Sequence, residues 1–395
     1  MLKGVQLSMR IGDVVTMPVP QEVIESLTSV QVTSGSGQRS GFQLSFTTGK
    51  RSLITTTLLP AGFFDPPRRV ILTVTINGRA EVLCDGCITR HEVQASNDPG
   101  QSTLTLTGED LSVLMDMVDF TGIKRYPAMP FEVRALICLA PYAAFGVIPK
   151  IIPSVIVAVE NPLTRMPGHQ GTDYEYLRYM AESVGYVFYL EPGPMPGMNF
   201  AYWGPEIKFG VPQPALTVNS DAHSNVDSMN FSFDGTSKKL FIFYVQTPAT
   251  PPVSFPIPLP DITPLNPPLG PKVPFPLRTE FLNRPPERRR RPLPPEDEDS
   301  EEGNVRMPPT QAALIAMAKA SRSADVITAS GQLNVLRYGR PLKARQLVSV
   351  RGAGRAYDGF YYVKSITHNL KRGEYKQSFS LSRNAHLPFS ESVPV

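Results

Sequence analysis

Alternating apolar and polar positions dominate residues 1–109 and predict a β-rich first part of the chain. The dipeptides Asn77-Gly78 and Asp85-Gly86 are typical of two-residue hairpin turns, because such pairs tolerate a positive φ. The stretch from Ser34 to Gly41 predicts a longer flexible loop. A small antiparallel barrel or sandwich fits this pattern. The predicted strands are Ser29–Thr33, Gly41–Thr48, Val70–Ile76, Arg79–Cys84 and Cys87–Gln94.

The period of the apolar positions changes from two to nearly 3.6 in residues 110–215, which predicts a middle domain of mixed α and β structure. The last of its helices is the best marked. Thr172 and Glu175 have the spacing of a capping box, and Gly185 is placed to end the helix. The predicted helices are Leu111–Val118, Phe131–Leu139 and Tyr174–Val184.

Strand patterns return in residues 216–247 and again in residues 309–388, after a helix predicted at Gln311–Ala320. These two segments are expected to form the two parts of a second β module, and residues 389–395 a C-terminal tail. A turn at Lys371–Glu374 joins the last two strands. The predicted strands are Asn225–Phe233, Lys239–Val245, Leu347–Val350, Phe360–Thr367 and Tyr375–Ser382, with a turn at Asp234-Gly235.

Proline interrupts this second module. Nineteen of the 41 prolines lie between Pro248 and Pro309. Because proline fixes φ and removes a hydrogen-bond donor, residues 248–308 are expected to form a partly disordered insertion in which no sheet or helix propagates. The basic block Arg288–Arg291 and the acidic block Glu296–Glu302 could pair with each other.

A weak internal repeat links the two β-rich parts of the chain. Asp85-Gly86 leads into a strand, a turn at Pro99-Gly100 and the run Ser102–Thr107. Asp358-Gly359 leads into a strand, a turn at Gly373 and the run Gln377–Ser382. Duplication and chance similarity both explain so short a match.

Composition excludes several classes of protein. A chain of 395 residues with 41% hydrophobic and 19% charged residues is long enough for two or three globular domains. A net charge of only +4 predicts no nucleic-acid or membrane-surface partner. No signal peptide is expected, and the richest apolar run, Ala135–Ile152, contains Pro141 and Pro149, so no membrane span is predicted.

Candidate chemistry is sparse. The three cysteines, Cys84, Cys87 and Cys138, are too few for a disulfide framework. Cys84-Asp-Gly-Cys87 could be a redox pair or half of a zinc site, but a hairpin turn explains it better because no second ligand pair follows. We therefore predict no catalytic, cofactor-binding or metal-binding residue and no cofactor. The five histidines, which show no triad or metal spacing, are His91, His169, His223, His368 and His386.

Aromatic side chains are frequent in the predicted strands, where a buried core is favoured over an exposed contact surface. Carboxylate pairs such as Glu109 and Asp110 fit a helix start better than a glycosidase pair. The strand aromatics are Phe241, Phe243, Tyr244, Phe360, Tyr361, Tyr362, Tyr375 and Phe379.

Three blocks of sequence resemble the phage late control D family, which comprises the baseplate hub proteins of contractile tails and resembles the hub portion of type VI secretion spike proteins. They are Leu347–Arg383, Thr103–Asp116 and Thr172–Tyr189. The resemblance implies a homotrimer in which each subunit contributes two tube-like β modules to a ring of pseudo-sixfold symmetry. Such a ring joins a hexameric tail tube to a trimeric spike.

The expected fold is thus α+β and mainly β, with two tube-like antiparallel β-barrel modules, an intervening α/β domain and a Pro-rich insertion. The insertion at 248–308 departs from the family pattern, and it either contacts baseplate or wedge proteins or forms an unstructured loop. The spike is expected to be a separate protein. We expect a virion structural protein that is not an enzyme, made in the bacterial cytoplasm and incorporated into a tail baseplate.

Two alternatives to a hub stay open. One is a tail-associated cell-wall hydrolase, which would need a catalytic cluster. The other is a receptor- or glycan-binding β protein, for which exposed aromatics and Trp203 give slight support. The sequence does not distinguish a phage from a tailocin or another injection system.

Overall fold

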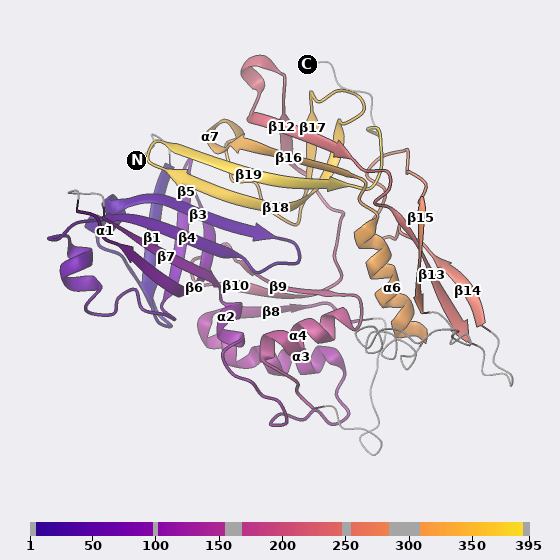
Figure 1. The fold of residues 1–395 in the computed structure, drawn as a ribbon, viewed down its shortest axis with the longest axis horizontal. Helices are drawn as coiled ribbons and strands as arrows, with labels where there is room; N and C mark the ends of the chain where they lie inside the picture. The colour runs from indigo at the N-terminus through magenta and orange to yellow at the C-terminus, as the bar shows by residue number, and fades with distance from the viewer. Residues whose placement is uncertain (1–4, 98–101, 155–167, 247–253, 284–308, 390–395) are drawn as a thin grey trace.

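One large, mainly antiparallel sheet runs through the computed structural model, which describes residues 5–97, 102–154, 168–246, 254–283 and 309–389 (Figure 1). The prediction of a mainly β chain is confirmed. The strand order along the described part of this sheet is β12-β16-β19-β18-β3-β4-β7-β6-β5-β1-β2, so the described strands leave it open and do not close it into a barrel. Strand β17 adds to β18, and β11 adds to β17.

The bounds of its first strands are β1 Val5–Gly12, β2 Thr16–Pro18, β3 Leu27–Gly35, β4 Gly41–Thr48, β5 Arg69–Ile76, β6 Arg79–Gln94 and β7 Ser102–Asp110. Those of the remaining strands are β11 Gln213–Thr217, β12 Val226–Phe233, β16 Ile327–Asn334, β17 Leu347–Arg351, β18 Gly359–Lys371 and β19 Glu374–Arg383. Short helical segments connect them: α1 Gln21–Ser26, η1 Ile54–Leu58, η3 Asp221–His223 and α7 Val335–Tyr338.

Two groups of five strands within this sheet share one strand order. We call β3–β7 the first module, and its order is β5-β6-β7-β4-β3 with every pair antiparallel. We call β12 and β16–β19 the second module, and its order is β17-β18-β19-β16-β12, again antiparallel. When the five strands of each module are numbered by their order along the chain, their order across the sheet is third, fourth, fifth, second, first in both modules. The shared topology favours duplication over chance as the source of the sequence repeat.

The fourth strand of each module also has a similar irregularity. In the first module a bulge falls between Ile88 and Arg90 of β6, opposite β7. In the second module a bulge falls between Val363 and Ser365 of β18, opposite β19. A bulge bends a strand and increases its twist, so each of the two hairpins bends near the end that lies farthest from its turn. The repeat thus extends from strand order to local geometry.

Strand β18 joins the two modules. Its first residues pair with β17, and Ser365–Lys371 pair with Ser29–Gly35 of β3. The two modules therefore share backbone hydrogen bonds and form one continuous sheet (Figure 1).

The hairpin predicted at Asp85-Gly86 is wrong, because β6 runs through both residues without a turn. Asp85 is 2% exposed and takes part in an ion pair, while Gly86 lies so close to β7 that a Cβ atom there would be 2.0 Å from the carbonyl oxygen of Glu109. Glycine is needed at this position because β6 and β7 approach each other closely, and not because the chain turns there. The other predicted hairpin is confirmed, since Asn77 and Gly78 have φ values of 49° and 78° between β5 and β6.

The middle domain has its own small sheet and its own core, with helices below the sheet in Figure 1. The predicted capping box is confirmed, because the hydroxyl of Thr172 accepts from the backbone N–H of Glu175 and the Glu175 carboxylate accepts from that of Thr172. Gly185 follows the helix with a φ of 73°. The first predicted helix is much shorter than expected. The elements are α2 Ser112–Met115, α3 Phe131–Leu139, η2 Ala140–Phe145, β8 Val147–Ile151, α4 Asp173–Glu182, β9 Val187–Pro192 and β10 Asn199–Gly204.

Part of the Pro-rich insertion is ordered as a sheet, which corrects the prediction that none could form there. Strands β14 Ser254–Leu259 and β15 Arg278–Asn283 pair with the two sides of β13 Lys239–Gln246, and α6 Pro309–Ser323 packs on this sheet. Pro256 and Pro258 fit because β14 is an edge strand, so their missing N–H groups need no partner strand.

The same insertion is fastened to the end of β19. The guanidinium of Arg383 donates to the carbonyl oxygens of Leu269 and Asp358, and the Asn384 side chain accepts from the backbone N–H of Leu269 at 2.8 Å. The ordered part is therefore docked on the second module. The charge blocks Arg288–Arg291 and Glu296–Glu302, the predicted turn at Pro99-Gly100 and the tail from residue 390 lie outside the described residues. Within those described, no helix is long and apolar enough to cross a membrane.

Candidate functional site

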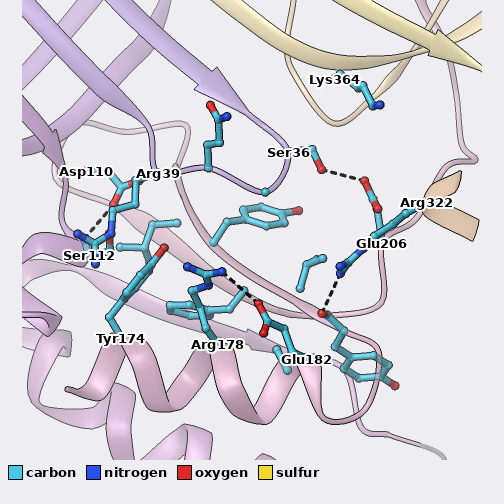
Figure 2. A pocket seen from close by; sticks show the side chains of 18 of the residues that line it. Ser36, Arg39, Asp110, Ser112, Tyr174, Arg178, Glu182, Glu206, Arg322 and Lys364 are labelled. Atoms are coloured by element: carbon cyan, nitrogen blue, oxygen red, sulfur yellow. Dashed lines mark hydrogen bonds and ion pairs between the residues drawn. The ribbon is translucent and has the colours of Figure 1, made fainter. Parts of the chain in front are cut away.

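A cavity of about 290 Å³ opens where the first module, the middle domain and the second module meet (Figure 2). The loop between β3 and β4 contributes Ser36–Arg39, and the middle domain contributes side chains from α4 and β9. Figure 2 shows Arg39 and Tyr174 on one side and Glu206, Arg322 and Lys364 on the other. The cavity is a junction of three parts of the chain.

Arg39 organises one wall of this cavity. Its guanidinium lies 3.2 Å from Glu109 and 2.6 Å from Asp116, and it stacks over the ring of Tyr174 at 3.8 Å. Burial alone would lower the pKa of Arg39, but the hydrogen bond to Asp116 and contacts with Tyr174 outweigh burial and raise it. Asp116 also accepts from the hydroxyl of Thr172 at 2.6 Å. The β3–β4 loop is thus tied to the start of α4.

The opposite wall rests on a buried ion pair. The ammonium of Lys208 lies 3.1 Å from the carboxylate of Asp325, with side chains only 3% and 5% exposed. Lys364 of β18 approaches the same carboxylate at 3.7 Å. Ser36 donates to Glu206 at 2.8 Å and joins the first module to this wall. Most charged groups around the cavity therefore hold protein segments together.

The chemistry of the lining is consistent with such a joint. No histidine or cysteine is among the described residues that line the cavity. Arg178 pairs with Glu182 along the exposed side of α4 at 3.1 Å. The Ser36–Glu206 contact lacks the intervening base that an activated serine requires. The arrangement holds the first module, the middle domain and the second module in a fixed relative orientation.

A second cluster, buried inside the middle domain, escaped the sequence predictions. Cys138 of α3, His169 and Asp173 at the start of α4 bring one potential ligand atom each to within 4.8 Å of one another. Burial raises the pKa of the Cys138 thiol to about 11 and lowers the pKa of His169, which the backbone of Thr172 and the charge of Asp173 oppose only in part. The sequence carried no signal beyond the i, i+4 spacing of His169 and Asp173, because the cysteine lies 31 residues before the histidine.

The Cys84-x-x-Cys87 motif does not form a site of its own. Both cysteines are free, and they face different cores: Cys84 packs in the core of the first module and Cys87 in that of the middle domain. Burial raises the pKa of Cys87 to about 12 and that of Cys84 well above its usual range. Both thiols therefore stay protonated near neutral pH. Strand β6 continues from Cys84 to Cys87, so the hairpin turn predicted between the two cysteines does not form.

His368, Trp203 and the aromatic residues of the predicted strands have mainly structural roles. His368 is 4% exposed, with Nδ1 2.8 Å from the hydroxyl of Tyr375. Trp203 is fully buried and donates from Nε1 to the carbonyl oxygen of Leu177 at 3.3 Å, so it offers no exposed platform for a glycan. The predicted strand aromatics are largely core residues: Phe241, Tyr361, Tyr362, Tyr375 and Phe379 are buried, Tyr244 is half-buried, Phe360 is 36% exposed, and the Phe243 side chain is not described.

Comparison with solved structures identifies the fold. The tail protein from Neisseria meningitidis MC58 superposes with a TM-score of 0.59 at 15% identity, covering 96% of this chain and 97% of that one. The 43 kDa tail protein of prophage MuSo2 from Shewanella oneidensis gives a TM-score of 0.60 at 14% identity, covering 96% and 98%. The chain has the fold of phage tail proteins.

A protein of a Francisella complex has a similar fold. A chain of the half-lidded Francisella PdpA–VgrG complex matches with a TM-score of 0.57 at 8% identity. The match covers 100% of the present chain and 60% of that one, so this chain spans less than two thirds of the Francisella protein. No family model matches the sequence, and no curated protein matches it. The resemblance noted in the sequence to phage hubs and secretion spike proteins thus agrees with the fold.

Proposed function

We propose that this protein is the structural baseplate hub of a contractile phage tail or a related injection system. Three copies form a ring of pseudo-sixfold symmetry that joins a hexameric tail tube to a trimeric spike. The observation that carries the proposal is the repeated five-strand order of the first and second modules. The fold shared with tail proteins supports it.

Symmetry explains why one chain would contain two such modules. A sixfold partner presents six equivalent surfaces, whereas a threefold partner presents three. Three chains with two similar modules each match both partners. The six modules bind the six surfaces of the tube, and the three identical chains bind the three surfaces of the spike. In this proposal the two modules act as tube-like β modules once the copies assemble. The open ends of the described sheet, at β2 and β12, support this because they leave backbone groups for neighbouring chains.

The hub acts by holding surfaces in place, and catalysis is no part of the proposal. The cavity at the junction supports this role. Arg39, Lys208 and Lys364 pair with carboxylates on other segments there, and these contacts fix the modules relative to the middle domain. A fixed geometry is what a symmetry adaptor requires, since binding to a preformed surface avoids the cost of ordering it.

The insertion is proposed to contact surrounding baseplate or wedge proteins. Support comes from its ordered part, which is docked on β19 and exposes the apolar side chains of Phe275 and Leu277, 81% and 70% exposed. Replacing residues 248–308 by a short linker should leave the trimer intact and impair particle assembly. Normal assembly of infectious or contractile particles with that deletion would overturn this part of the proposal.

Co-assembly tests the proposed function. The purified full chain is mixed with the tail tube protein and the spike protein from the same source, and each mixture is analysed by size-exclusion chromatography. We expect complexes with each partner and a ternary complex with both. Failure to bind either partner would overturn the proposal. A peptidoglycan zymogram run in parallel should show no clearing, and clearing would favour a cell-wall hydrolase instead.

A further inference from the structure

Three side chains with metal-ligand chemistry converge in the middle domain, and all three are buried. Cys138 comes from α3, Asp173 begins α4, and His169 precedes α4 by a few residues. Their side chains are at most 1% exposed. A thiol, an imidazole and a carboxylate within 4.8 Å of one another form a donor set typical of zinc and related divalent transition metals.

His169 provides an independent indication of a ligand. Its Nδ1 lies 2.9 Å from the hydroxyl oxygen of Tyr126. Its Nε2 is buried, lies 3.5 Å from Oδ1 of Asp173 and makes no hydrogen bond of normal geometry to any described residue. An unsatisfied buried polar atom costs on the order of 1–3 kcal/mol, so a native protein usually gives it a partner. When Nδ1 donates to Tyr126, Nε2 carries the lone pair that a metal would use.

Lys124 occupies the place of a counter-cation. Its ammonium donates to both carboxylate oxygens of Asp173, at 2.8 and 3.1 Å, and the hydroxyl of Tyr142 donates to the same carboxylate at 3.0 Å. The Lys124 side chain is 24% exposed, whereas that of Asp173 is 1% exposed. The lysine can therefore move its charge into solvent without opening the core.

We propose that Cys138, His169 and Asp173 bind one Zn²⁺ ion, which takes the place of the Lys124 ammonium. Binding forms bonds from the metal to Sγ, Nε2 and a carboxylate oxygen, and it releases the thiol proton of Cys138 to solvent. The charges balance: the ion contributes two positive charges, and the thiolate and carboxylate contribute one negative charge each. No oxidation or reduction takes place. The bound ion cross-links α3 to the start of α4 and has a structural role.

The proposal is independent of the hub function, because it concerns the interior of one domain. The full chain is stripped of metal with a chelator and titrated with Zn²⁺, and separately with Co²⁺ as a spectroscopic probe. We expect one equivalent of Zn²⁺ per chain, release of one proton, a higher unfolding temperature, and a thiolate-to-cobalt charge-transfer band with Co²⁺. Absence of stoichiometric binding, or a cobalt spectrum without that band, would overturn the site.

Matched variants locate the ion. Cys138→Ser should abolish the charge-transfer band, whereas Cys84→Ser, another buried free cysteine outside the cluster, should retain it. His169→Gln should weaken Zn²⁺ binding by more than about 100-fold, since even supporting residues around a metal typically change its affinity by about 10- to 100-fold. If Cys138→Ser does not fold, Lys124→Met decides: removing the competing ammonium should tighten Zn²⁺ binding. Unchanged affinity in His169→Gln or Lys124→Met would show adventitious binding only and overturn the proposal.

Discussion

Arg69 and Asp85 form a two-point ion pair inside the protein, with Nε–Oδ1 and Nη2–Oδ2 distances of 2.7 Å. The two side chains are 4% and 0% exposed. Asn199 of β10 donates to Oδ2 of Asp85 at 2.8 Å, and Arg69 also donates to the carbonyl oxygen of Gly197 at 3.3 Å. The pair therefore fastens β5 and β6 of the first module to the small sheet of the middle domain.

Asp85→Asn should destabilise the protein by about 3–5 kcal/mol, because it leaves the buried guanidinium of Arg69 without a counter-charge. Chemical denaturation of the full chain measures the change. Asp13→Asn is the control, since it breaks the neighbouring pair of Asp13 and Arg68, whose side chains are 75% and 36% exposed. Exposed pairs contribute at most about 1 kcal/mol. Equal losses in the two variants would show that burial does not decide the effect.

His368 should make stability depend on pH. Burial lowers the pKa of His368 to about 4, against an ordinary value of about 6.5. Between these values the unfolded chain takes up a proton that the folded chain does not, so this contribution is fully present above about pH 6.5 and is lost as the pH falls toward 4. At about pH 5 the loss should reach about 2 kcal/mol.

The measurement is urea denaturation at about pH 7 and about pH 5 for the wild type and for His368→Gln. The variant should show a smaller change between the two pH values, by about 2 kcal/mol. The same substitution at the exposed His223 should leave the pH dependence unchanged. An identical pH dependence in wild type and His368→Gln would contradict the assignment.

The docked insertion should loosen when Asn384 is shortened. Its side chain accepts from the backbone N–H of Leu269 at 2.8 Å and donates to the carbonyl oxygen of Pro267 at 3.0 Å, with only 1% exposed. Asn384→Ala should cost about 1–3 kcal/mol and speed hydrogen exchange at the Leu269 amide. Hydrogen-exchange mass spectrometry tests this against Asn230→Ala at an exposed position of β12. Unchanged exchange near Leu269 in Asn384→Ala would show that the docking contact is unimportant.

Trp203 should report on the middle domain alone, because it is the only tryptophan and is fully buried. We expect blue-shifted fluorescence with little quenching by acrylamide in the native state, and no change on adding glycans. Both emission and quenching should shift when the domain unfolds. A red-shifted, readily quenched native spectrum would place this side chain in solvent and revive the glycan-binding alternative.

Local patterns predicted elements whose stability is local. The bounds of β4 and α3 equal those predicted, and the capping box of Thr172 and Glu175 is present, because alternation, helical periodicity and cap spacing are properties of adjacent residues. The hairpin prediction at Asp85-Gly86 was wrong because the conformation there depends on residues that are distant in the sequence. The same two residues suit a tight turn and a buried ion pair, and the second choice depends on Asn199, 114 positions away.

Long-range contacts also explain the other misses. Pro256 and Pro258 exclude an interior strand but not an edge strand, and the sequence does not show which side of β13 they occupy. Cys138 meets His169 and Asp173 only because α3 packs against the start of α4. The repeat of Asp-Gly steps did indicate two related modules, although Gly86 lies inside a strand and Gly359 begins one. Shared strand order is a property of topology, which short sequence matches only hint at.

Native mass spectrometry of the purified full chain tests most directly whether three copies present six related modules. We predict a particle with the mass of three chains, stable on dilution, that adds a tube hexamer and a spike trimer when these are supplied. A monomer at every concentration, alone and in the presence of both partners, would contradict the proposed hub function.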